Sequence, residues 1–297
     1  MTLIEQVKVL YPDFGTADIS KMLKTRQTTI KKIVDDNNFH LIKNRRINID
    51  DFYNIQKKEI SYLLGLIWAD GHVAKGNNMI NIECVSDDMT SFKETLDKVG
   101  RWSYHHRKRI DKRTNTRPVT NAYICDNLLH KFLEDNDYLE KSKRSPNKII
   151  EKIPKYLLKY FLLGIVDGDG CFYFKKSEAS QFTIAGDKNQ DWSIIQKIFS
   201  DLDIRYTIVK NNSSSVIRVT NKKDIKKIGN FIYSAIEDDN IGLVRKYEKY
   251  KLIISKLIEN EKIIEYIKNS NKSTKELLIE LNISRFRLNK LVKDNNI

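Results

Sequence analysis

A nine-residue segment that occurs twice constrains the fold of this chain more than any other feature. Residues 63–71 read LLGLIWADG and residues 162–170 read LLGIVDGDG, so that Asp70 and Asp169 are separated by 99 residues. Self-similarity of this kind indicates that one structural unit has been duplicated. Each copy is mainly apolar and ends in an acidic residue followed by glycine, which is typical of a core helix that stops near the aspartate. We therefore expect two similar halves.

The segments that follow the two copies are also alike in kind. Strand-like runs and amphipathic helices alternate after each copy. After the first copy the strands are expected at 79–85, 102–106 and 121–125, with helices at 88–99 and 127–134. After the second copy the strands are expected at 171–174, 181–185, 204–210 and 216–220, with helices at 191–202 and 224–235. The simplest description of each half is αββαββα, which predicts an α+β chain with two pseudo-symmetric repeats at about 55–155 and 156–252.

A second repeat flanks this pair. Residues 16–39 align without gaps to residues 274–297, and both copies end in Asp-Asn-Asn and an apolar residue. Each copy predicts a short helix (17–23 and 275–281), a tight break and a second helix (27–35 and 285–293), preceded by an apolar helix (3–10 and 262–267). Three short helices with a basic last one are typical of a helix-turn-helix unit. We expect such units at 1–45 and 260–297; a small helical cap packed on the two repeats is the alternative.

The charge of the chain favours a polyanionic partner. Lys and Arg total 53 against 39 Asp and Glu, for a net charge of +14 that is spread along the sequence. A globular protein this basic usually binds nucleic acid. The cysteines Cys84, Cys125 and Cys171 are isolated, which predicts neither a zinc site nor a disulfide framework and fits a reducing compartment. The sequence shows neither a signal peptide nor an apolar run long enough for a membrane span, so we expect a cytoplasmic protein of a bacterial or phage-infected cell, or of an organelle.

The spacing of small residues within the nine-residue motif predicts how its helix packs. Gly65 with Ala69, and Gly164 with Gly168, lie one turn apart on one helical face, where small side chains let two helices approach closely. Pairing the motif helices would bring Asp70 and Asp169 together at two helix C-termini, which is costly without a cation. Hard divalent ions such as Mg²⁺ suit such carboxylates and can promote phosphodiester cleavage. The closing glycines, Gly71 and Gly170, are expected to take a left-handed backbone conformation.

These residues resemble the LAGLIDADG homing endonucleases in their single-chain form with two motif copies. The resemblance covers about residues 55–250 and implies two four-stranded antiparallel sheets that form a saddle on DNA. It also implies Mg²⁺-dependent (or Mn²⁺-dependent) cleavage of both strands at a long site. Carried over by position, Asp70 and Asp169 are the catalytic, metal-binding acids, and the carbonyl groups of Ala69 and Gly168 are further metal ligands.

The resemblance also implies a lysine near the end of each half, close to the scissile phosphate. Lys141, within the stretch Leu-Glu-Lys-Ser, is the candidate in the first half, with Lys143 and Lys148 as rivals. Lys246 is the candidate in the second half. The sixth motif position is often acidic in the family without binding metal; here it is Trp68, read as a packing residue, and Asp167, read as a polar group at the helix end.

DNA contacts are expected from the strands and from the terminal helices. Alternating side chains on an exposed sheet face can read base edges, while most lysines meet phosphate. The strand candidates are Arg101, Tyr104, Arg107, Lys108, Arg109, Lys175, Lys176, Gln181, Thr183, Arg205, Tyr206, Lys210 and Arg218. The candidates around the last helices of the terminal units are Arg26, Lys31, Lys32, Arg285, Arg287 and Lys290. His105 and His106 are not expected to share a metal, because neighbouring strand residues point to opposite faces.

Two other functions use the same scaffold. A regulator with degenerate motifs binds DNA without cutting it, but both aspartates are present here. A maturase that assists intron splicing, with intron RNA as its partner, stays open. We expect an intron-encoded or freestanding protein that acts on double-stranded DNA as a monomer, because one chain supplies both halves.

Overall fold

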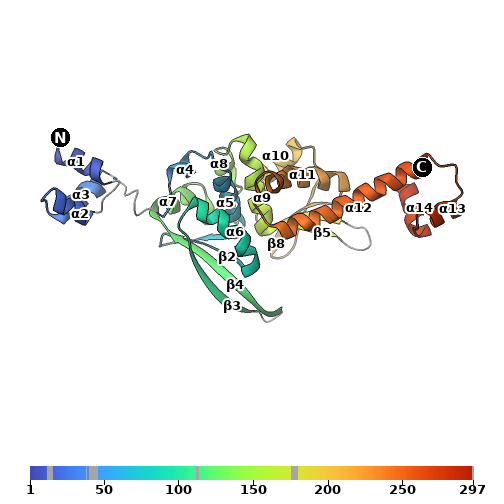
Figure 1. The fold of residues 1–297 in the computed structure, drawn as a ribbon, viewed down its shortest axis with the longest axis horizontal. Helices are drawn as coiled ribbons and strands as arrows, with labels where there is room; N and C mark the ends of the chain where they lie inside the picture. Colours follow the sequence, from blue (N-terminus) through green and yellow to red (C-terminus); the bar gives the residue numbers. More distant parts are fainter. Residues whose placement is uncertain (12–15, 38, 40–45, 112–113, 175–179, 296–297) are drawn as a thin grey trace. The chain divides into compact units, whose positions relative to one another are not determined.

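The computed structural model describes residues 1–297 apart from 12–15, 38, 40–45, 112–113, 175–179 and 296–297. The chain divides into two compact units: Met1–Lys141 with Pro146–Phe161, and Ser142–Ser145 with Leu162–Ile297. The first unit contains one αββαββα repeat and the second contains most of another, each with one small helical unit (Figure 1); residues 158–161, which begin the second repeat, belong to the first unit. The four-part division expected from the sequence, with its boundaries, stays a prediction.

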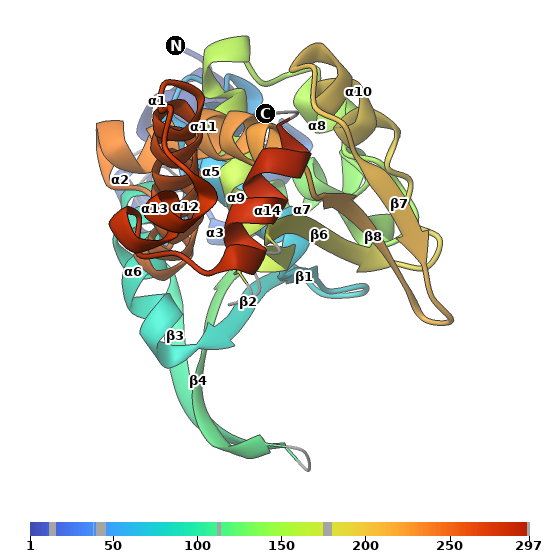
Figure 2. The same ribbon diagram turned by 90° about the vertical axis from the view of Figure 1, so that its right-hand side faces the viewer.

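The first repeat begins with the motif helix α5 and ends with α7. Its elements are α5 (Lys58–Ala69), β1 (Gly71–Val73), β2 (Met79–Val85), α6 (Ser86–Val99), β3 (Ser103–Asp111), β4 (Thr114–Cys125) and α7 (Asn127–Asp135). The strands form an antiparallel sheet in the order β1-β2-β4-β3, with Ile82 opposite Ala122. The β3–β4 hairpin extends beyond the helices of its repeat (Figure 2). Short helices follow at α8 (Asn147–Ile150) and at two 3-10 turns, η1 (Tyr138–Glu140) and η2 (Lys155–Leu157); α4 (Asp50–Tyr53) precedes the repeat.

The second repeat has the same element order and the same strand order. Its elements are α9 (Leu158–Asp169), β5 (Gly170–Phe174), β6 (Ser180–Asp187), α10 (Ser193–Asp201), β7 (Thr207–Lys210), β8 (Ser214–Val219) and α11 (Lys222–Asp239). The sheet runs β5-β6-β8-β7, again antiparallel. The predicted fold class, a pair of αββαββα repeats, is therefore confirmed. The sequence prediction missed β1, because a strand of three residues is too short to show alternation.

One face of each sheet packs against the helices of its repeat and forms the core. In the first repeat Ile80, Ile82 and Ile124 are fully buried on this face, together with Phe132 of α7. In the second repeat the core is aromatic: Phe172 and Phe182 lie with ring centroids 4.6 Å apart, and Phe172 lies 5.4 Å from Tyr233 of α11. Burial of alternate strand residues fixes the strand register, so the other face of each sheet carries the remaining side chains.

The terminal repeat is reproduced in the structure. The first copy forms α2 (Thr16–Met22) and α3 (Gln27–Asp36), and the second forms α13 (Thr274–Glu280) and α14 (Arg285–Asp294). In both copies the residue at the same place in the turn, Lys24 or Asn282, has a left-handed backbone, with φ of 48° and 47°. Each unit has a small core of its own, around Ile19 and Ile30 or around Leu277 and Leu288. The helix before the first copy is α1 (Leu3–Leu10).

The helix before the second copy is much longer than the sequence prediction. Residues 262–267 are only the end of α12 (Val244–Lys268), a single helix of 25 residues. The stretch contains neither glycine nor proline, so nothing in its backbone interrupts the helix. None of the helices in the described residues is both long and apolar enough to cross a membrane.

Candidate active site and nucleic-acid interface

In each repeat the motif aspartate lies where the motif helix meets the first strand. Asp70 follows the last residue of α5, and its backbone N–H donates to the Leu66 carbonyl at 2.9 Å. Its side chain is exposed. Asp169 is the last residue of α9, and β5 begins at the next residue. The sequence prediction of an acidic residue at the end of each motif helix is confirmed.

The closing glycines serve close packing rather than a left-handed turn. Gly71 and Gly170 are not among the positive-φ residues of the described chain. A Cβ on Gly71 would lie 2.6 Å from Cα of Ile67, and one on Gly170 would lie 2.6 Å from Cα of Val166. The strand leaves the helix so sharply that its first residue touches the last helical turn. The expected left-handed conformation was therefore wrong: glycine is needed here because it lacks a Cβ.

Lys141 binds the end of the first motif helix. Its Nζ donates to the carbonyl oxygen of Ile67 at 2.9 Å and to that of Ala69 at 2.7 Å. The rival Lys148 lies elsewhere, with its Nζ 2.8 Å from the Asp137 carboxylate and 3.3 Å from the Asp135 carbonyl. Of these two, only Lys141 contacts the carbonyl group next to the motif aspartate.

Lys246 binds the second motif helix in the same way. It is the third residue of α12, and its side chain is buried. Its Nζ donates to the carbonyls of Val166 at 2.8 Å, Asp167 at 2.7 Å and Gly170 at 2.8 Å, and lies 3.4 Å from that of Gly168. Val166 and Gly168 occupy the motif places of Ile67 and Ala69. The structure thus brings one lysine of each repeat to equivalent carbonyl groups, beside the motif aspartate.

The donor groups at each motif end suit a hard cation. They are a carboxylate and helix-end carbonyls, which are the oxygen ligands that Mg²⁺ prefers. Within the described chain, no group of three or more His, Cys, Asp or Glu residues gathers as a metal site. The carbonyls of Ala69 and Gly168 already face an ammonium group, although a carbonyl oxygen has a second lone pair. Metal binding by Asp70, Asp169 and these carbonyls stays a prediction, as does the close approach of the motif helices through Gly65 and Gly164.

The sixth motif residues differ in chemistry but are both buried. Trp68 packs edge-on against Tyr138, with ring centroids 5.0 Å apart and an interplanar angle of 80°. Asp167 accepts a hydrogen bond from the backbone N–H of Leu243 at 2.9 Å. Trp68 is therefore a packing residue, as predicted, and Asp167 contacts the start of α12, which the sequence did not suggest.

The strand alternation separates the predicted contacts of β3. Cross-strand partners share a face: Tyr104 pairs with Ala122 of the core face, whereas Arg107 pairs with Val119, which lies on the same face as Asn121 and Glu83. Tyr104 therefore lies on the helix-covered face, where its hydroxyl donates to Asp97 of α6 at 2.7 Å. Burial, followed by this hydrogen bond, raises the pKa of the Tyr104 hydroxyl. Adjacent strand residues point to opposite faces of the sheet, so Tyr104 and Lys108 lie on one face and Arg107 lies on the other.

The outward face of the first sheet carries residues that the sequence analysis did not single out. Asn81 and Asn121 lie on this face and their side chains are hydrogen-bonded at 3.1 Å, while Arg107 forms an ion pair with Glu83. Tyr123 lies opposite Asn81 on the same face. The alternation of buried isoleucines in β2 is the sequence signal that would have identified them. Arg101 precedes β3 and is exposed; the side chain of Arg109 lies outside the described part of the chain.

In the second sheet the outward face carries Gln181, Thr183 and Arg218. Thr183 pairs with Arg218, and Arg218 pairs with Thr207 of β7. Lys210 pairs with the buried Ser215, so it belongs to the other face. Lys175 and Lys176 lie outside the described residues. Gln181 and Arg218 are thus the predicted contacts that the sheet places together.

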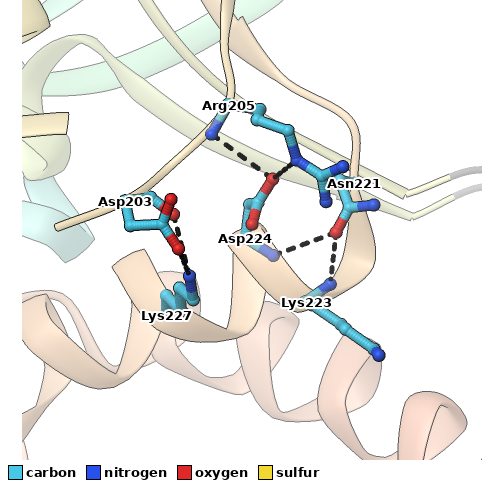
Figure 3. Close-up of polar contacts among 6 residues, drawn as sticks. All are labelled: Asp203, Arg205, Asn221, Lys223, Asp224 and Lys227. Carbon is cyan, nitrogen blue, oxygen red and sulfur yellow. Dashed lines mark hydrogen bonds and ion pairs between the residues drawn. The ribbon is translucent and has the colours of Figure 1, made fainter. Parts of the chain in front are cut away.

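Arg205 and Tyr206 precede β7 and are tied to the helices of their repeat. The buried Asp224 accepts from the Arg205 side chain at 2.8 Å and from its backbone N–H at 3.3 Å (Figure 3). Lys227, which lies on α11 together with Asp224, donates to the Asp203 carboxylate at 2.6 Å. The Tyr206 hydroxyl accepts from Gln196 at 3.2 Å. These contacts fix the entry into β7, and a role of Arg205 in binding DNA stays a prediction.

The predicted contacts of the terminal units also divide into two groups. Arg26, Lys31 and Lys32 are exposed in the first unit, as is Arg285 in the second. Arg287 instead binds α12, with its guanidinium 2.9 Å from both the Glu259 carboxylate and the Asn260 amide oxygen. Lys290 is partly buried. The exposed group is the one available to a nucleic acid.

Comparisons with known proteins give likenesses of structure only. No protein-family model matches the sequence, and no curated protein matches it. The solved structures that it resembles include the homing endonuclease I-WcaI bound to its DNA recognition sequence, at a TM-score of 0.49 and 16% identity, over 72% of this chain and 96% of that one. Another is the LAGLIDADG meganuclease I-CpaMI bound to uncleaved DNA, at a TM-score of 0.43 and 15% identity, over 74% and 96%. A third is the K262A mutant of I-SmaMI, at 0.42 and 18%, over 75% and 96%.

The assignment of the fold depends on the chain itself. Both motif copies form the first helix of an αββαββα repeat, and both sheets have the same strand order. With these two features, the chain has two repeats of one topology, which is the topology that the resemblance of the motifs led us to expect.

Proposed function

We propose that this protein is a site-specific homing endonuclease that makes double-strand breaks in DNA. The observation that carries the proposal is the repeated lysine geometry: Lys141 and Lys246 bind equivalent carbonyls beside Asp70 and Asp169. A duplex has two similar strands, and a chain with two equivalent groups of reactive residues matches such a substrate. A positive charge of +14 supports binding to a polyanion.

The proposed reaction needs divalent metal ions, and Asp70 and Asp169 would each provide a carboxylate ligand. When bound, such an ion supplies an activated water and stabilises charge on the phosphate oxygens. The lysines neutralise the negative ends of the motif helices, which would otherwise oppose both carboxylates and an approaching phosphate. They also place an ammonium group beside each aspartate, where charge develops during phosphodiester cleavage.

In this proposal the outward faces of the sheets and the terminal units bind DNA. Arg107, Gln181 and Arg218 lie on the outward faces. In the proposed complex Arg107 and Gln181 make paired contacts to base edges, and Arg218 contacts phosphate. The exposed basic residues of the helix-turn-helix-like units would add phosphate contacts. One chain supplies both repeats, so we propose a monomer.

The test is cleavage of a randomised duplex-DNA library by the purified full chain with Mg²⁺ or Mn²⁺. We expect specific double-strand breaks from the wild type, and loss of these breaks in Asp70→Asn and in Asp169→Asn. Asp201→Asn is the matched control, because Asp201 is an exposed aspartate at the end of another helix, α10. This control should cut as the wild type does.

Two outcomes would contradict the proposal. Salt-sensitive binding without cleavage in either metal would assign the protein to the non-cleaving regulators or to the maturases. Cleavage that survives both substitutions would remove Asp70 and Asp169 from the active site.

A further inference from the structure

We propose that the sixth residue of each motif, Trp68 or Asp167, is a positioning residue for the lysine of its own repeat. The inference rests on the proposed function, because it treats Lys141 and Lys246 as active-site residues. Tryptophan and aspartate have no chemistry in common, so their shared role is not visible in the sequence. It follows from what each side chain contacts.

In the second repeat the contact is a hydrogen bond to the start of a helix. The Asp167 carboxylate accepts from the backbone N–H of Leu243 at 2.9 Å. Leu243 is the N-cap residue of α12, and its own side chain cannot cap the helix. A carboxylate at a helix N-terminus is bound both by the N–H group and by the helix dipole. Lys246 lies one turn further on, so the carboxylate fixes the part of α12 that carries it.

The approach of Leu243 to Asp167 depends on the preceding residue. Gly242 has a φ of 117°, a conformation that favours glycine. A Cβ at this position would lie 3.0 Å from the Asp167 carboxylate oxygen and 2.8 Å from the Leu163 side chain. The chain is therefore shaped to bring the start of α12 against the motif helix.

In the first repeat the contact is aromatic. Trp68 packs edge-on against Tyr138, and the Tyr138 hydroxyl donates to the Leu64 carbonyl of the motif helix at 3.0 Å. Tyr138 begins the 3-10 turn η1, and Lys141 follows that turn directly. Tyr138 is fully buried, so its ring fixes the turn to α5.

The two contacts fall at equivalent places. Tyr138 lies three residues before Lys141, and Leu243 lies three residues before Lys246. In each repeat the sixth motif residue thus holds the residue that stands one helical turn ahead of the lysine, while the lysine binds the carbonyls of the same motif helix. Two contacts therefore position each lysine. One is made by its own ammonium group with the carbonyls of the motif helix, and the other is made by the sixth motif residue with the residue three positions before the lysine.

The test measures how fast each lysine of the full chain is acetylated by an N-hydroxysuccinimidyl acetate reagent, with sites resolved by mass spectrometry. Asp167→Ala should raise the rate at Lys246 by about tenfold or more, since hydrogen bonds to charged groups are worth that factor in an equilibrium. The rate at Lys141 should stay unchanged. Asp167→Asn keeps an oxygen that can accept from Leu243, and should leave Lys246 protected.

The first repeat provides the reciprocal control. Trp68→Leu should expose Lys141 and leave Lys246 protected, while Trp68→Phe keeps an aromatic edge and should protect Lys141. An unchanged rate at Lys246 in Asp167→Ala would overturn the inference, and so would an equal rise at both lysines, which would indicate general loosening.

Cleavage separates this inference from the proposed function. For a DNA site that the wild type cuts, Asp167→Ala should lower the single-turnover rate without changing the affinity measured in the absence of divalent metal. A wild type that cuts no DNA would contradict the proposed function, and the labelling rates would still decide whether Trp68 and Asp167 position the lysines.

Discussion

The Nζ of Lys246 lies 2.8 Å from the carbonyl oxygen of Val166, and the Nζ of Lys141 lies 2.9 Å from that of Ile67, the residue at the same place in the other motif. Carbonyl groups in the last turn of a helix have no partner within the helix and carry partial negative charge. In each repeat a lysine ammonium group donates to these carbonyls. The two lysines come from different elements: Lys141 follows a 3-10 turn, and Lys246 lies inside a long helix.

Removing the buried ammonium should destabilise the protein. Lys246→Met leaves the carbonyls of Val166, Asp167 and Gly170 without this donor, at a cost of about 1–3 kcal/mol in the free energy of unfolding. Urea denaturation measures the change. Lys143→Met is the matched control, because Lys143 is exposed, and should be near neutral. Equal midpoints for the two variants would contradict the prediction.

Alanine should be tolerated much less at Gly71 than at Gly76. A Cβ on Gly71 would lie 2.6 Å from Cα of Ile67 and 2.7 Å from its carbonyl oxygen, so backbone must move. Gly76 has open space but a φ of 87°, so alanine there costs only the left-handed penalty of about 1–2 kcal/mol. Thermal unfolding of Gly71→Ala and Gly76→Ala compares the two. A smaller loss for Gly71→Ala would show that the strand can withdraw from the helix.

The attachment of α14 to α12 should weaken in acid. Hydrogen bonds from Lys256 and then Arg287 lower the pKa of Glu259 below its ordinary value of 4.5. A carboxyl group with a lowered pKa in the folded state stabilises that state fully above pH 4.5, and the contribution is lost as the pH falls through the lowered pKa. Hydrogen exchange of the α14 amides, corrected for the intrinsic rate, should therefore show loss of protection below pH 4.5.

Glu259→Gln is the matched variant for this pH dependence. The amide does not titrate, so the part of the acid-induced loss that comes from residue 259 should disappear. Since the Glu259 side chain is 42% exposed, water and salt screen the interaction and we expect a small effect. The same pH profile in both proteins would assign the loss to other carboxyl groups.

The outward face of the second sheet should carry the salt dependence of DNA binding. Arg218 lies on this face between Thr183 and Thr207. Because Arg218 is proposed to contact phosphate, Arg218→Ala should weaken binding and reduce the slope of log affinity against log salt by about 1. Lys197→Ala is the control, since Lys197 is exposed on α10 and should leave the slope unchanged. Equal slopes for both variants would place the DNA elsewhere.

Local sequence signals predicted much of the fold. The terminal repeat gave helices that match to within one residue at each end, because short polar breaks interrupt the apolar pattern between the helices. The duplicated motif placed Asp70 and Asp169 at helix ends because each apolar run stops at an acidic residue followed by glycine. The long α12 was only partly predicted, since its apolar residues do not keep to one helical face.

The contacts of the candidate site were less predictable, because they join segments far apart in the sequence. Lys141 lies 74 residues from Ile67, and Leu243 lies 76 residues from Asp167. The resemblance named both lysines but not their carbonyl partners. Side-chain alternation along β3 implies that Tyr104 and Arg107 lie on opposite faces of the sheet, but the strand register was needed to tell which face each one occupies.

The unbroken helix α12 fixes both the distance and the rotation about its axis at which the C-terminal helical unit is held. At 1.5 Å per residue its 25 residues span about 38 Å, close to one turn of B-DNA. Lys246 stands in the first turn, and Arg287 fastens α14 to Glu259 and Asn260 further along the same helix. Because each residue advances an α-helix by about 100°, one inserted residue between these points would swing the terminal unit to another side of the helix axis, whereas seven would nearly restore it. The helix therefore acts as a rigid spacer: an insertion close to a whole number of turns keeps the direction in which the terminal unit projects, and any other insertion changes it.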